Sequence, residues 1–439
     1  MQSDEGGEST VVEPAPEAPA GGRRRFGELW RNADFLKFWA GESLSLAGAQ
    51  ISLLGLPLTA VLVLNAGAEE LGLLRLLQLL PYLFLALLFG IVADRNPRRP
   101  LMIASNLLRA TALGLVPVLT VVHQLNIGLL DVIALLVGIG AVMFDVCWLS
   151  YIPTVVADRR LLVEANSKLG TSSSAAEIAG PGLAGALIQV LSAPYALAVN
   201  AGSYLLSVIS LLAIRTPEQR PEPTKEKGNL LRDAREGLVW VFGNSYLRVL
   251  ALLGGSYNFF LTFIETVFLV YAVRTLNLSV EVIGIVLSAG GIGGLLGAML
   301  ANTALTRFGL GRVYSVSVLV AFAAPVLIPL AGGPQLFVAG VLVAAFFLTS
   351  LGIGTANVIV ITLRQAVTPR RLMGRMNAAM RMLMFGIAAL GSPAGGFLSV
   401  WLGLHGALWV AGVASILALV PLFRSEIPKL TELPKPVDD

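Results

Sequence analysis

Long apolar runs recur along the whole chain, and they constrain its fold more than any other feature. Most of them last roughly 20 residues or more, the length that an α-helix needs to cross the hydrocarbon core of a bilayer. The 439 residues are 56% hydrophobic and only 13% charged, whereas a soluble protein carries about 25% charged residues. Only lipid suits so apolar a surface, so the sequence predicts an all-α integral membrane protein.

Polar breaks divide the apolar sequence into twelve predicted membrane-spanning helices, in two sets of six. They cover residues 35–64, 70–92, 100–122, 129–153, 169–191, 194–214, 246–273, 281–305, 312–331, 335–363, 375–401 and 404–423. The predicted organisation begins with a disordered cytoplasmic tail (1–33), a six-helix bundle (34–214) and a cytoplasmic linker (215–245). A second six-helix bundle (246–424) and a second cytoplasmic tail (425–439) follow.

The second part of the linker, from Leu230 to Phe242, alternates apolar and charged residues at helical spacing. Its apolar members are Leu230, Leu231, Leu238 and Val241, and its charged members are Arg232, Asp233, Arg235 and Glu236. This pattern predicts an amphipathic helix that lies at the membrane surface.

The positions of Lys and Arg predict the orientation, because basic residues gather in cytoplasmic loops. With both termini inside, the 31 basic residues are cytoplasmic except for Arg75, Arg109 and Arg381 within helices and Arg274 outside. We therefore expect a multi-pass plasma (inner) membrane protein with both termini in the cytoplasm. The same loops account for the sequence pI of about 9.3, so we expect no nucleic-acid partner.

The two sets of helices are related in sequence. An alignment of the two sets without gaps places DRRLLVEANS, from Asp158, over PRRLMGRMNA, from Pro369. The same alignment places Gly180 and Gly185 over Gly391 and Gly396. A parallel repeat of six helices is a transporter architecture whose binding site lies between the halves, near the middle of the membrane.

Three stretches resemble one family. Residues 90–102, GIVADRNPRRPLM, resemble the loop between helices two and three of the major facilitator superfamily, with Pro97 in place of a usual glycine. AEIAGPGLAG, at 176–185, is similar to the antiporter motif of that family, although Ala176 and Ala184 replace glycines. RQAVTPRRLMGRMNA, at 364–378, resembles the branch that contains siderophore and macrolide exporters.

The resemblance implies two pseudo-symmetric six-helix bundles that open alternately to the two sides of the membrane. It implies that Asp94 meets the start of helix eleven when the inner gate is shut, an arrangement that a helix N-terminus favours. The implied gating residues are Gly90, Asp94, Arg95, Arg98, Arg99 and Arg375. The implied antiporter-motif residues on helix five are Gly180, Pro181 and Gly185.

Acidic residues inside predicted membrane helices are costly, which makes them functional candidates. Helices one, four and seven line the cavity of the resembled fold, and they carry Glu42, Asp145 and Glu265, our proton-coupling candidates. Trp148 follows Asp145 by three residues and Asn258 precedes Glu265 by seven, so both are substrate-cavity candidates. Packing or ion pairing alone also explains Glu177, Arg109 and Arg381, and an interfacial position also explains Glu42.

The sequence thus predicts a secondary transporter that exports a small amphiphilic molecule, such as a drug, siderophore or similar metabolite, in antiport with protons. The alternatives are a lysophospholipid or lipid transporter of the same fold and a non-transporting membrane receptor or sensor. We expect a monomer in the lipid bilayer, with no catalytic residues, cofactor or metal. The only histidines, His123 and His405, are far apart in sequence, and Cys147 is the only cysteine. We find no nucleotide-binding motif, so ATP is not the expected energy source.

Overall fold

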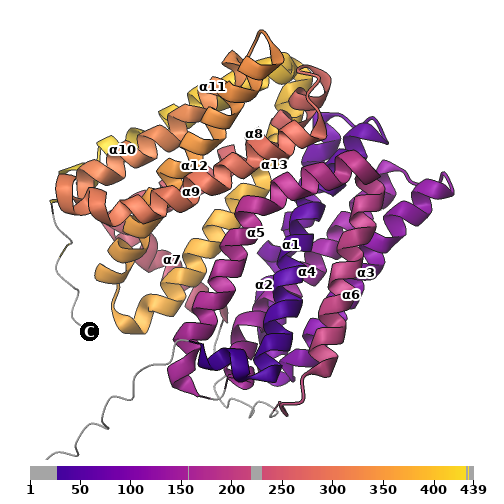
Figure 1. Cartoon of the computed structure of the whole chain (residues 1–439). Coiled ribbons are helices and arrows are strands. Elements are labelled where there is room, and N and C mark those ends of the chain that lie inside the picture. Colours follow the sequence, from indigo (N-terminus) through magenta and orange to yellow (C-terminus); the bar gives the residue numbers. More distant parts are fainter. Residues whose placement is uncertain (1–26, 157, 219–229, 432–433, 435–439) are drawn as a thin grey trace, which may run out of the picture.

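The computed structural model describes residues 27–156, 158–218, 230–431 and 434, and almost all of this part of the chain is helical (Figure 1). The first group of helices, the N-half, comprises η1 (Glu28–Arg31), α1 (Ala33–Leu62), α2 (Ala68–Arg95), α3 (Arg98–Val121), α4 (Ile127–Val155), η2 (Arg159–Leu161), α5 (Leu162–Leu191) and α6 (Ala193–Ala213).

Helix α7 (Leu230–Gly243) follows the N-half and precedes the second group, the C-half. The C-half comprises α8 (Ser245–Arg274), α9 (Val280–Phe308), α10 (Leu310–Ala323), η3 (Ala324–Val326), α11 (Leu327–Leu330), α12 (Gln335–Ala366), η4 (Arg370–Leu372), α13 (Met373–Leu417), α14 (Val420–Phe423) and η5 (Ile427–Lys429).

Polar caps fix where several of the long helices begin. The side chain of Asn32 accepts hydrogen bonds from the Asp34 and Phe35 amides at the start of α1, at 3.1 and 3.0 Å. Asn244 caps α8 in the same way, through the Tyr246 and Leu247 amides. Such caps satisfy amide groups that have no partner within the helix, and they stand at the polar breaks from which the sequence predicts the helix boundaries.

Ten helical stretches in the described part of the chain are long and apolar enough to cross a membrane. Helix α2 is not among them, and one of the ten, Met373–Phe423, is far longer than a single crossing needs. Its backbone turns at Gly403, where φ is 70° and ψ is 166°, between two predicted spans. A straight α13 of 45 residues would measure about 68 Å at ~1.5 Å per residue, so the turn lets it cross twice. The total of twelve spans stays a prediction.

The two described ends of the chain lie at the same end of the molecule, which we call the terminal side; the opposite end is the distal side. Helix α1 runs from the terminal to the distal side, and the next helices alternate in direction (Figure 1). The chain returns to the terminal side after α13, because the Gly311 amide at the start of α10 donates to the Leu430 carbonyl at 2.7 Å.

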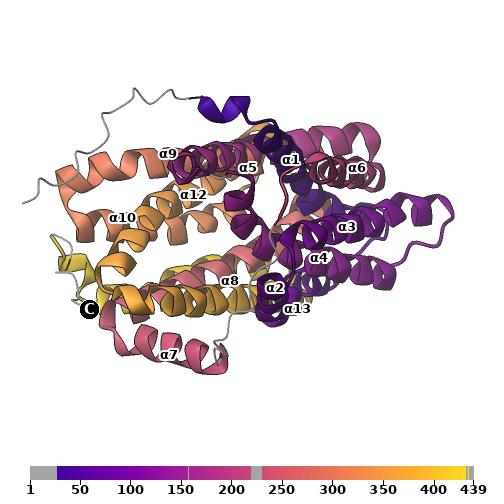
Figure 2. The same cartoon turned by 90° about the horizontal axis from the view of Figure 1, so that it is seen from below.

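The halves meet along two pairs of helices. Helix α5 of the N-half lies against α9 of the C-half, and α2 lies against α13, as seen from the terminal side (Figure 2). The contact is close on the distal side: a Cβ at Gly185 would meet the Val280 carbonyl and Gly284, and one at Gly72 would meet Ser392. The Arg274 guanidinium also donates to the Asn65 and Ala66 carbonyls of the other half, both at 2.7 Å.

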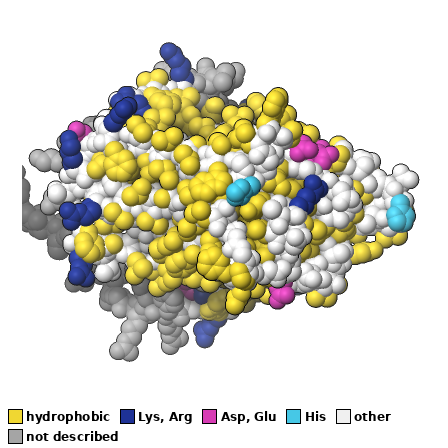
Figure 3. Space-filling view, turned by 90° about the horizontal axis from the view of Figure 1, so that it is seen from above, with side chains coloured by type: hydrophobic (Ala, Val, Ile, Leu, Met, Phe, Trp, Pro, Cys, Tyr) yellow, Lys and Arg dark blue, Asp and Glu magenta, His cyan; other side chains and the backbone are white. Residues whose placement is uncertain are grey.

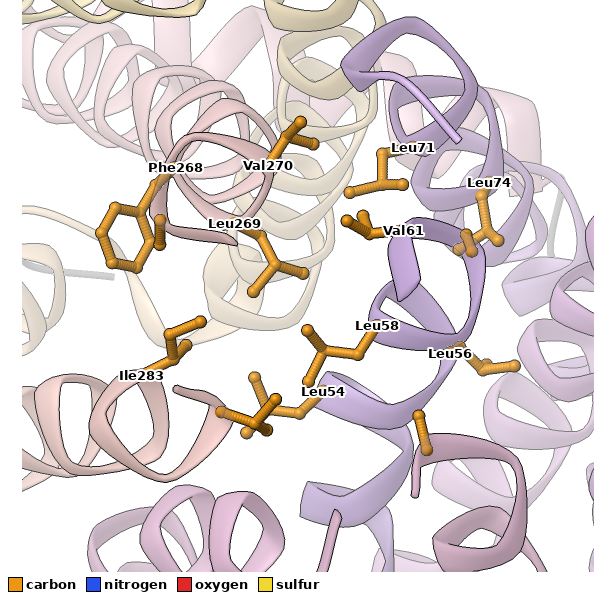
Figure 4. Packing of buried hydrophobic residues seen from close by; sticks show 14 of the residues in the cluster. Leu54, Leu56, Leu58, Val61, Leu71, Leu74, Phe268, Leu269, Val270 and Ile283 are labelled. Atoms are coloured by element: carbon orange, nitrogen blue, oxygen red, sulfur yellow. The ribbon is translucent and has the colours of Figure 1, made fainter. Parts of the chain in front are cut away.

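The buried apolar residues form one joint cluster on the distal side and two separate clusters on the terminal side. The distal cluster draws on both halves, and Leu58 and Val61 of α1 lie near Leu269 of α8 in Figure 4. On the terminal side, one cluster contains only residues of α7 and the C-half, and the other contains only residues of the N-half. Among the described residues, a shared apolar cluster therefore joins the two halves only on the distal side.

The sequence repeat is confirmed by equivalent contacts in the two halves. A Cβ at Gly180 would meet Gln50 on the first long helix of its own half, and a Cβ at Gly391 would meet Phe259 and Thr262 on the first long helix of its own half. Gly185 and Gly396, by contrast, approach the second long helix of the opposite half, α9 and α2 respectively. Positions related by the repeat thus make equivalent packing contacts, as expected for pseudo-symmetric halves.

The folded part extends beyond the predicted segment bounds at both ends. Leu29 in η1 is fully buried, although the sequence predicts a disordered tail up to residue 33, and Lys168 lies 3.8 Å over the ring of Trp30. Ile427 in η5 is also fully buried, inside the predicted C-terminal tail. These residues fold because they fill the terminal-side clusters. Residues 1–26 lie outside the described part of the chain.

The linker contains the predicted helix, α7, and this helix packs on the C-half. Val241 is fully buried in the C-half cluster, and Leu238 packs against that cluster. The side chains of residues 230–234, part of the predicted amphipathic pattern, lie outside the described residues. Val239 and Phe242 are exposed, and contact of α7 with the membrane surface stays a prediction.

Candidate functional site

A cavity of about 270 Å³ lies between the halves, and we call it the interface cavity. Helices α1, α2 and α5 of the N-half line it together with α8 and α9 of the C-half. Its charged and polar lining side chains are Gln50, Arg75, Glu177, Glu265 and Thr266. Burying polar groups at the centre of so apolar a molecule costs free energy unless they bind a ligand or pair with one another. This cavity is therefore the first candidate for a substrate site.

Arg75 and Glu265 form an ion pair that joins the two halves, and we call it the crossing pair. Nη2 of Arg75, on α2, lies 3.5 Å from Oε2 of Glu265, on α8. Arg75 also donates through Nη1 to Gln78 at 2.9 Å. Both partners lie in the distal half of their helices, beside the joint apolar cluster.

A second cavity, of about 150 Å³, lies inside the C-half, and we call it the C-half cavity. Aromatic and aliphatic side chains from α8, α10 and α12, among them Tyr257, Phe260 and Phe346, form most of its wall. Glu265 lines both cavities, so a single carboxylate faces the space between the halves and the apolar space within one of them.

The N-half has a polar centre of its own, made of Glu42, Tyr82, Arg109 and Asp145, which we call the N-half centre. Glu42 and Arg109 are each only 6% exposed, and the charges of Arg109 and Asp145 both act on the Glu42 carboxyl. The Arg109 guanidinium lies 4.2 Å over the ring of Tyr204 and donates to Asn106. Arg109 is thus the central cation of the buried N-half.

Asp145 connects the N-half centre with the other half. Its Oδ2 accepts a hydrogen bond from the Tyr82 hydroxyl at 2.7 Å, and the Tyr82 ring stacks on Phe385 of α13 with centroids 5.4 Å apart. The charges of Arg109 and of Arg381, on α13, act on the Asp145 carboxyl, which is exposed. An accessible acid can exchange a proton or bind a positively charged group.

The residues of the loop signature remain on the N-half. Glu218 accepts hydrogen bonds from the Arg98 and Arg99 amides, at 2.6 and 2.9 Å, so a carboxylate occupies the N-terminus of α3. Arg95 is exposed at the end of α2, and a Cβ at Gly90 would meet nothing within 4 Å. The side chain of Asp94 lies outside the described residues.

Arg375, the predicted partner of Asp94, lies in the first turn of α13. Its Nη1 is 2.7 Å from Oε2 of Glu236, on α7. This ion pair ties the linker helix to the start of α13. It lies on the terminal side, where the halves have separate apolar clusters.

The antiporter-motif residues lie at the distal contact between the halves. Pro181 lines the interface cavity, and α5 continues through it without a break. The neighbouring Gly182 amide donates to the Ser288 hydroxyl of α9 at 2.8 Å. Gly180 faces α1 and Gly185 faces α9, so the motif packs α5 against one helix of each half.

The two predicted substrate-cavity residues line neither cavity. The side-chain amide of Asn258 donates to the Gly254 carbonyl at 2.8 Å, and Asn258 lines neither space. Trp148 packs against the terminal-side cluster of the N-half. Residue spacing along one helix could not show which side of that helix faces a cavity.

Sequence reasoning missed the uncharged polar residues of the site, Gln50, Gln78, Tyr82 and Thr266, and did not assign Arg75 to it. A polar side chain in the middle of an apolar span was the available signal for the uncharged residues, and it is weaker than the signal from a charge. In the part of the chain that the structure describes, no three His, Cys, Asp or Glu side chains form a group that could hold a metal ion.

Two pseudo-symmetric helical halves with polar groups buried between them define a multi-pass membrane transporter. The sequence matches the Major Facilitator Superfamily over residues 38–387 and again over 259–439, and the chain belongs to this family of transporters.

Efflux proteins are among its relatives. The multidrug efflux pump Tap of Mycolicibacterium fortuitum is 27% identical over 394 residues, which cover 88% of this chain and 94% of that protein. Macrolide efflux protein A of Streptococcus pyogenes is 24% identical over 51% of this chain and 55% of its own length. The solved structure of nucleoside transporter NupG shares the fold with a TM-score of 0.74, at 14% identity, over 89% of this chain and 98% of that one.

Proposed function

We propose that this transporter exports a small amphiphilic molecule by alternating access, in exchange for protons. The observation that carries the proposal is the unequal packing of the two sides. One apolar cluster joins the halves distally, whereas separate clusters hold them on the terminal side. The efflux relatives support export as the direction.

The distribution of basic residues supports a cytoplasmic terminal side. Most of the Lys and Arg side chains in view in Figure 3, which looks at the distal side, lie along one edge of a largely hydrophobic and uncharged surface. We propose that this packing represents the state open toward the cytoplasm, in which an exporter takes up its substrate. We place the protein in the plasma (inner) membrane with both termini inside.

Asp145 and Glu265 are the acids that we propose for proton coupling. One lies in each half, both are at least partly exposed, and each interacts with an arginine. A carboxylate that takes up a proton loses its charge and with it the attraction to that arginine. A proton and a substrate can therefore compete for the same group, which is what antiport requires. Glu42 is more deeply buried and is the next candidate.

When the terminal side closes, we propose that the loop signature acts as the resemblance implies. Asp94 would then meet the start of α13, near Arg375, and the negative charge would be stabilised by the helix N-terminus. The end of α2 and the start of α13 would have to approach each other for this contact. Gly90, Arg95, Arg98 and Arg99 lie beside it on the N-half.

The test uses proteoliposomes with an acidic lumen and the membrane potential clamped at zero. A radiolabelled macrolide and tetraphenylphosphonium serve as the probes. We expect the wild type to concentrate at least one probe in the lumen, and we expect Asp145→Asn or Glu265→Gln to abolish this uphill transport while sparing downhill exchange. If both variants concentrate the probe at the wild-type rate, proton coupling through these residues is wrong.

Two further outcomes separate the rival functions. Transport of lysophospholipid but of neither probe would identify a lipid transporter. Saturable binding of a probe with no flux under any gradient would identify a receptor or sensor.

A further inference from the structure

The crossing pair has the geometry of an ion pair that can be displaced. Only one nitrogen of Arg75 approaches one oxygen of Glu265, and the distance is 3.5 Å, whereas strong guanidinium–carboxylate bonds measure about 2.7–2.9 Å and are often bidentate. The side chains are 18% and 37% exposed. Neither partner is sealed from a ligand in the adjacent cavities.

The interface cavity carries more negative than positive charge. Two carboxylates, Glu177 and Glu265, line it with one guanidinium, that of Arg75. Glu177 accepts a hydrogen bond from the Ser173 hydroxyl at 3.2 Å and forms no ion pair with any residue that the structure describes. The cavity would be neutral after binding one monovalent cation.

The C-half cavity adds an apolar surface next to the same carboxylate. Tyr257, Phe260, Phe322 and Phe346 contribute aromatic rings to its wall, and Glu265 is the only charged residue among those that line it in the described part of the chain. Aromatic faces and a carboxylate together favour a cation with an apolar body. Glu265 would repel an anionic ligand, and it could offer a neutral ligand no more than a hydrogen bond.

We propose that Arg75 is a built-in competitor for Glu265, and that an amphiphilic monovalent cation bound in the C-half cavity displaces it. Displacement breaks the crossing pair, which is one of the links that hold the two halves together on the distal side. Binding of the substrate therefore favours opening of that side. This inference rests on the proposed function and adds to it the substrate class and the residue that senses occupancy.

Arg274 provides a matched control. It is also an arginine that links the halves on the distal side, but it bonds the Asn65 and Ala66 carbonyls rather than an acid, and it lines neither cavity. Arg274→Gln weakens the distal contact without changing the charge at Glu265. Arg75→Lys keeps the competing charge and tests whether the charge itself matters.

The experiment measures equilibrium binding to the protein in nanodiscs, without any gradient. The probes are tetraphenylphosphonium and triphenylphosphine oxide, which is neutral and of similar shape. We expect Arg75→Gln to tighten binding of the cation about tenfold, within the ~5–150-fold range of coupling between sites, and to leave the neutral probe unchanged. Arg75→Lys should bind both probes as the wild type does, and Glu265→Gln should weaken binding of the cation alone.

Three outcomes would overturn the inference. The first is an unchanged affinity of Arg75→Gln for the cation. The second is an equal change in the affinity of Arg75→Gln for both probes. Such an equal change is what we expect of Arg274→Gln if that substitution shifts only the conformational equilibrium. The third is no cation binding to either the wild type or Arg75→Gln. Binding is measured without flux, so the two proposals can fail separately. A protein that binds the probes as expected but does not transport them would contradict the proposed function. It would still support competition between Arg75 and the cation for Glu265.

Discussion

The distal and terminal sides of the molecule are packed in different ways. Distally, residues such as Leu58 of the N-half and Leu269 of the C-half share one apolar cluster; on the terminal side each half has a cluster of its own. Contacts within a half can persist throughout a transport cycle, whereas contacts between the halves have to break for the distal side to open. The N-half centre lies largely within one half, and the crossing pair lies between the two.

This difference predicts that Arg109 matters most for stability. Replacing it with Met removes the buried guanidinium that donates to Asn106 and whose charge acts on Glu42, and leaving a buried charge without its opposite charge costs about 3–5 kcal/mol. We expect a large loss of thermal stability in detergent, with recovery in the triple variant Arg109→Met, Glu42→Gln, Asp145→Asn. Arg75→Met in the crossing pair should cost less, because that pair has a single contact of 3.5 Å and its side chains are 18% and 37% exposed. Equal losses for Arg109→Met and Arg75→Met would remove the distinction.

The next largest effect is expected at the contact between α5 and α9. Gly185→Leu introduces a side chain where the Val280 carbonyl and Gly284 leave no room, and such overpacking costs about 1–3 kcal/mol. Because the cost arises only when the distal side is closed, we expect faster labelling of distal cysteines and a loss of transport. Gly170→Ala, on the same helix but with nothing within 4 Å of its Cβ, should behave as the wild type. Unchanged distal labelling in Gly185→Leu would show that this contact does not close the distal side.

Asp94→Asn is expected to have a smaller effect, on the terminal side. If Asp94 meets the start of α13 when that side closes, its charge contributes about 0.3–1 kcal/mol there. The variant should then favour the state open on the terminal side by roughly two- to fivefold, with normal expression and reduced transport. The measurement is the labelling rate of a cysteine at Gly170, with a cysteine at His123 as the control. Normal labelling and flux would reduce the role of Asp94 to setting topology.

Pro181→Ala is expected to give the smallest effect. It restores one hydrogen bond within α5 and straightens that helix beside the interface cavity. The equivalent position in α13 is Ser392, which indicates that the packing tolerates other residues. We expect proton leak in vesicles to change by about twofold, equivalent to ~0.4 kcal/mol. If neither leak nor substrate efflux changes, the motif serves only for packing in this chain.

The helices, their repeat and the charged candidates could be predicted from the sequence because each leaves a strong local signal. Apolar runs interrupted by Asn32, Asn244 or Gly403 mark the helix ends closely. The cost of burying a charge identified Glu42, Asp145 and Glu265, and all three belong to the polar centres that the structure describes.

The partners of these acids could not be predicted, because they lie on other helices. The contact of Glu265 with Arg75 depends on how α8 meets α2, and the contact of Asp145 with Tyr82 depends on how α4 meets α2. Spacing within one helix led to Asn258 and Trp148, which line neither cavity. The burial of Leu29 and Ile427 could not be predicted either, since the clusters that bury them are assembled from distant segments.

The most direct test of alternating access measures distances across both sides at once. Cys147 is the only cysteine, so its replacement by Ser gives a background for spin labels. One pair, His123 and Gln335, spans the distal side, and the other, Val163 and Phe308, spans the terminal side; all four residues are exposed. With saturating tetraphenylphosphonium, we expect a longer distal distance and a shorter terminal distance in the same fraction of molecules. If ligand binding changes only one of the two distances, or neither of them, the result would contradict alternating access.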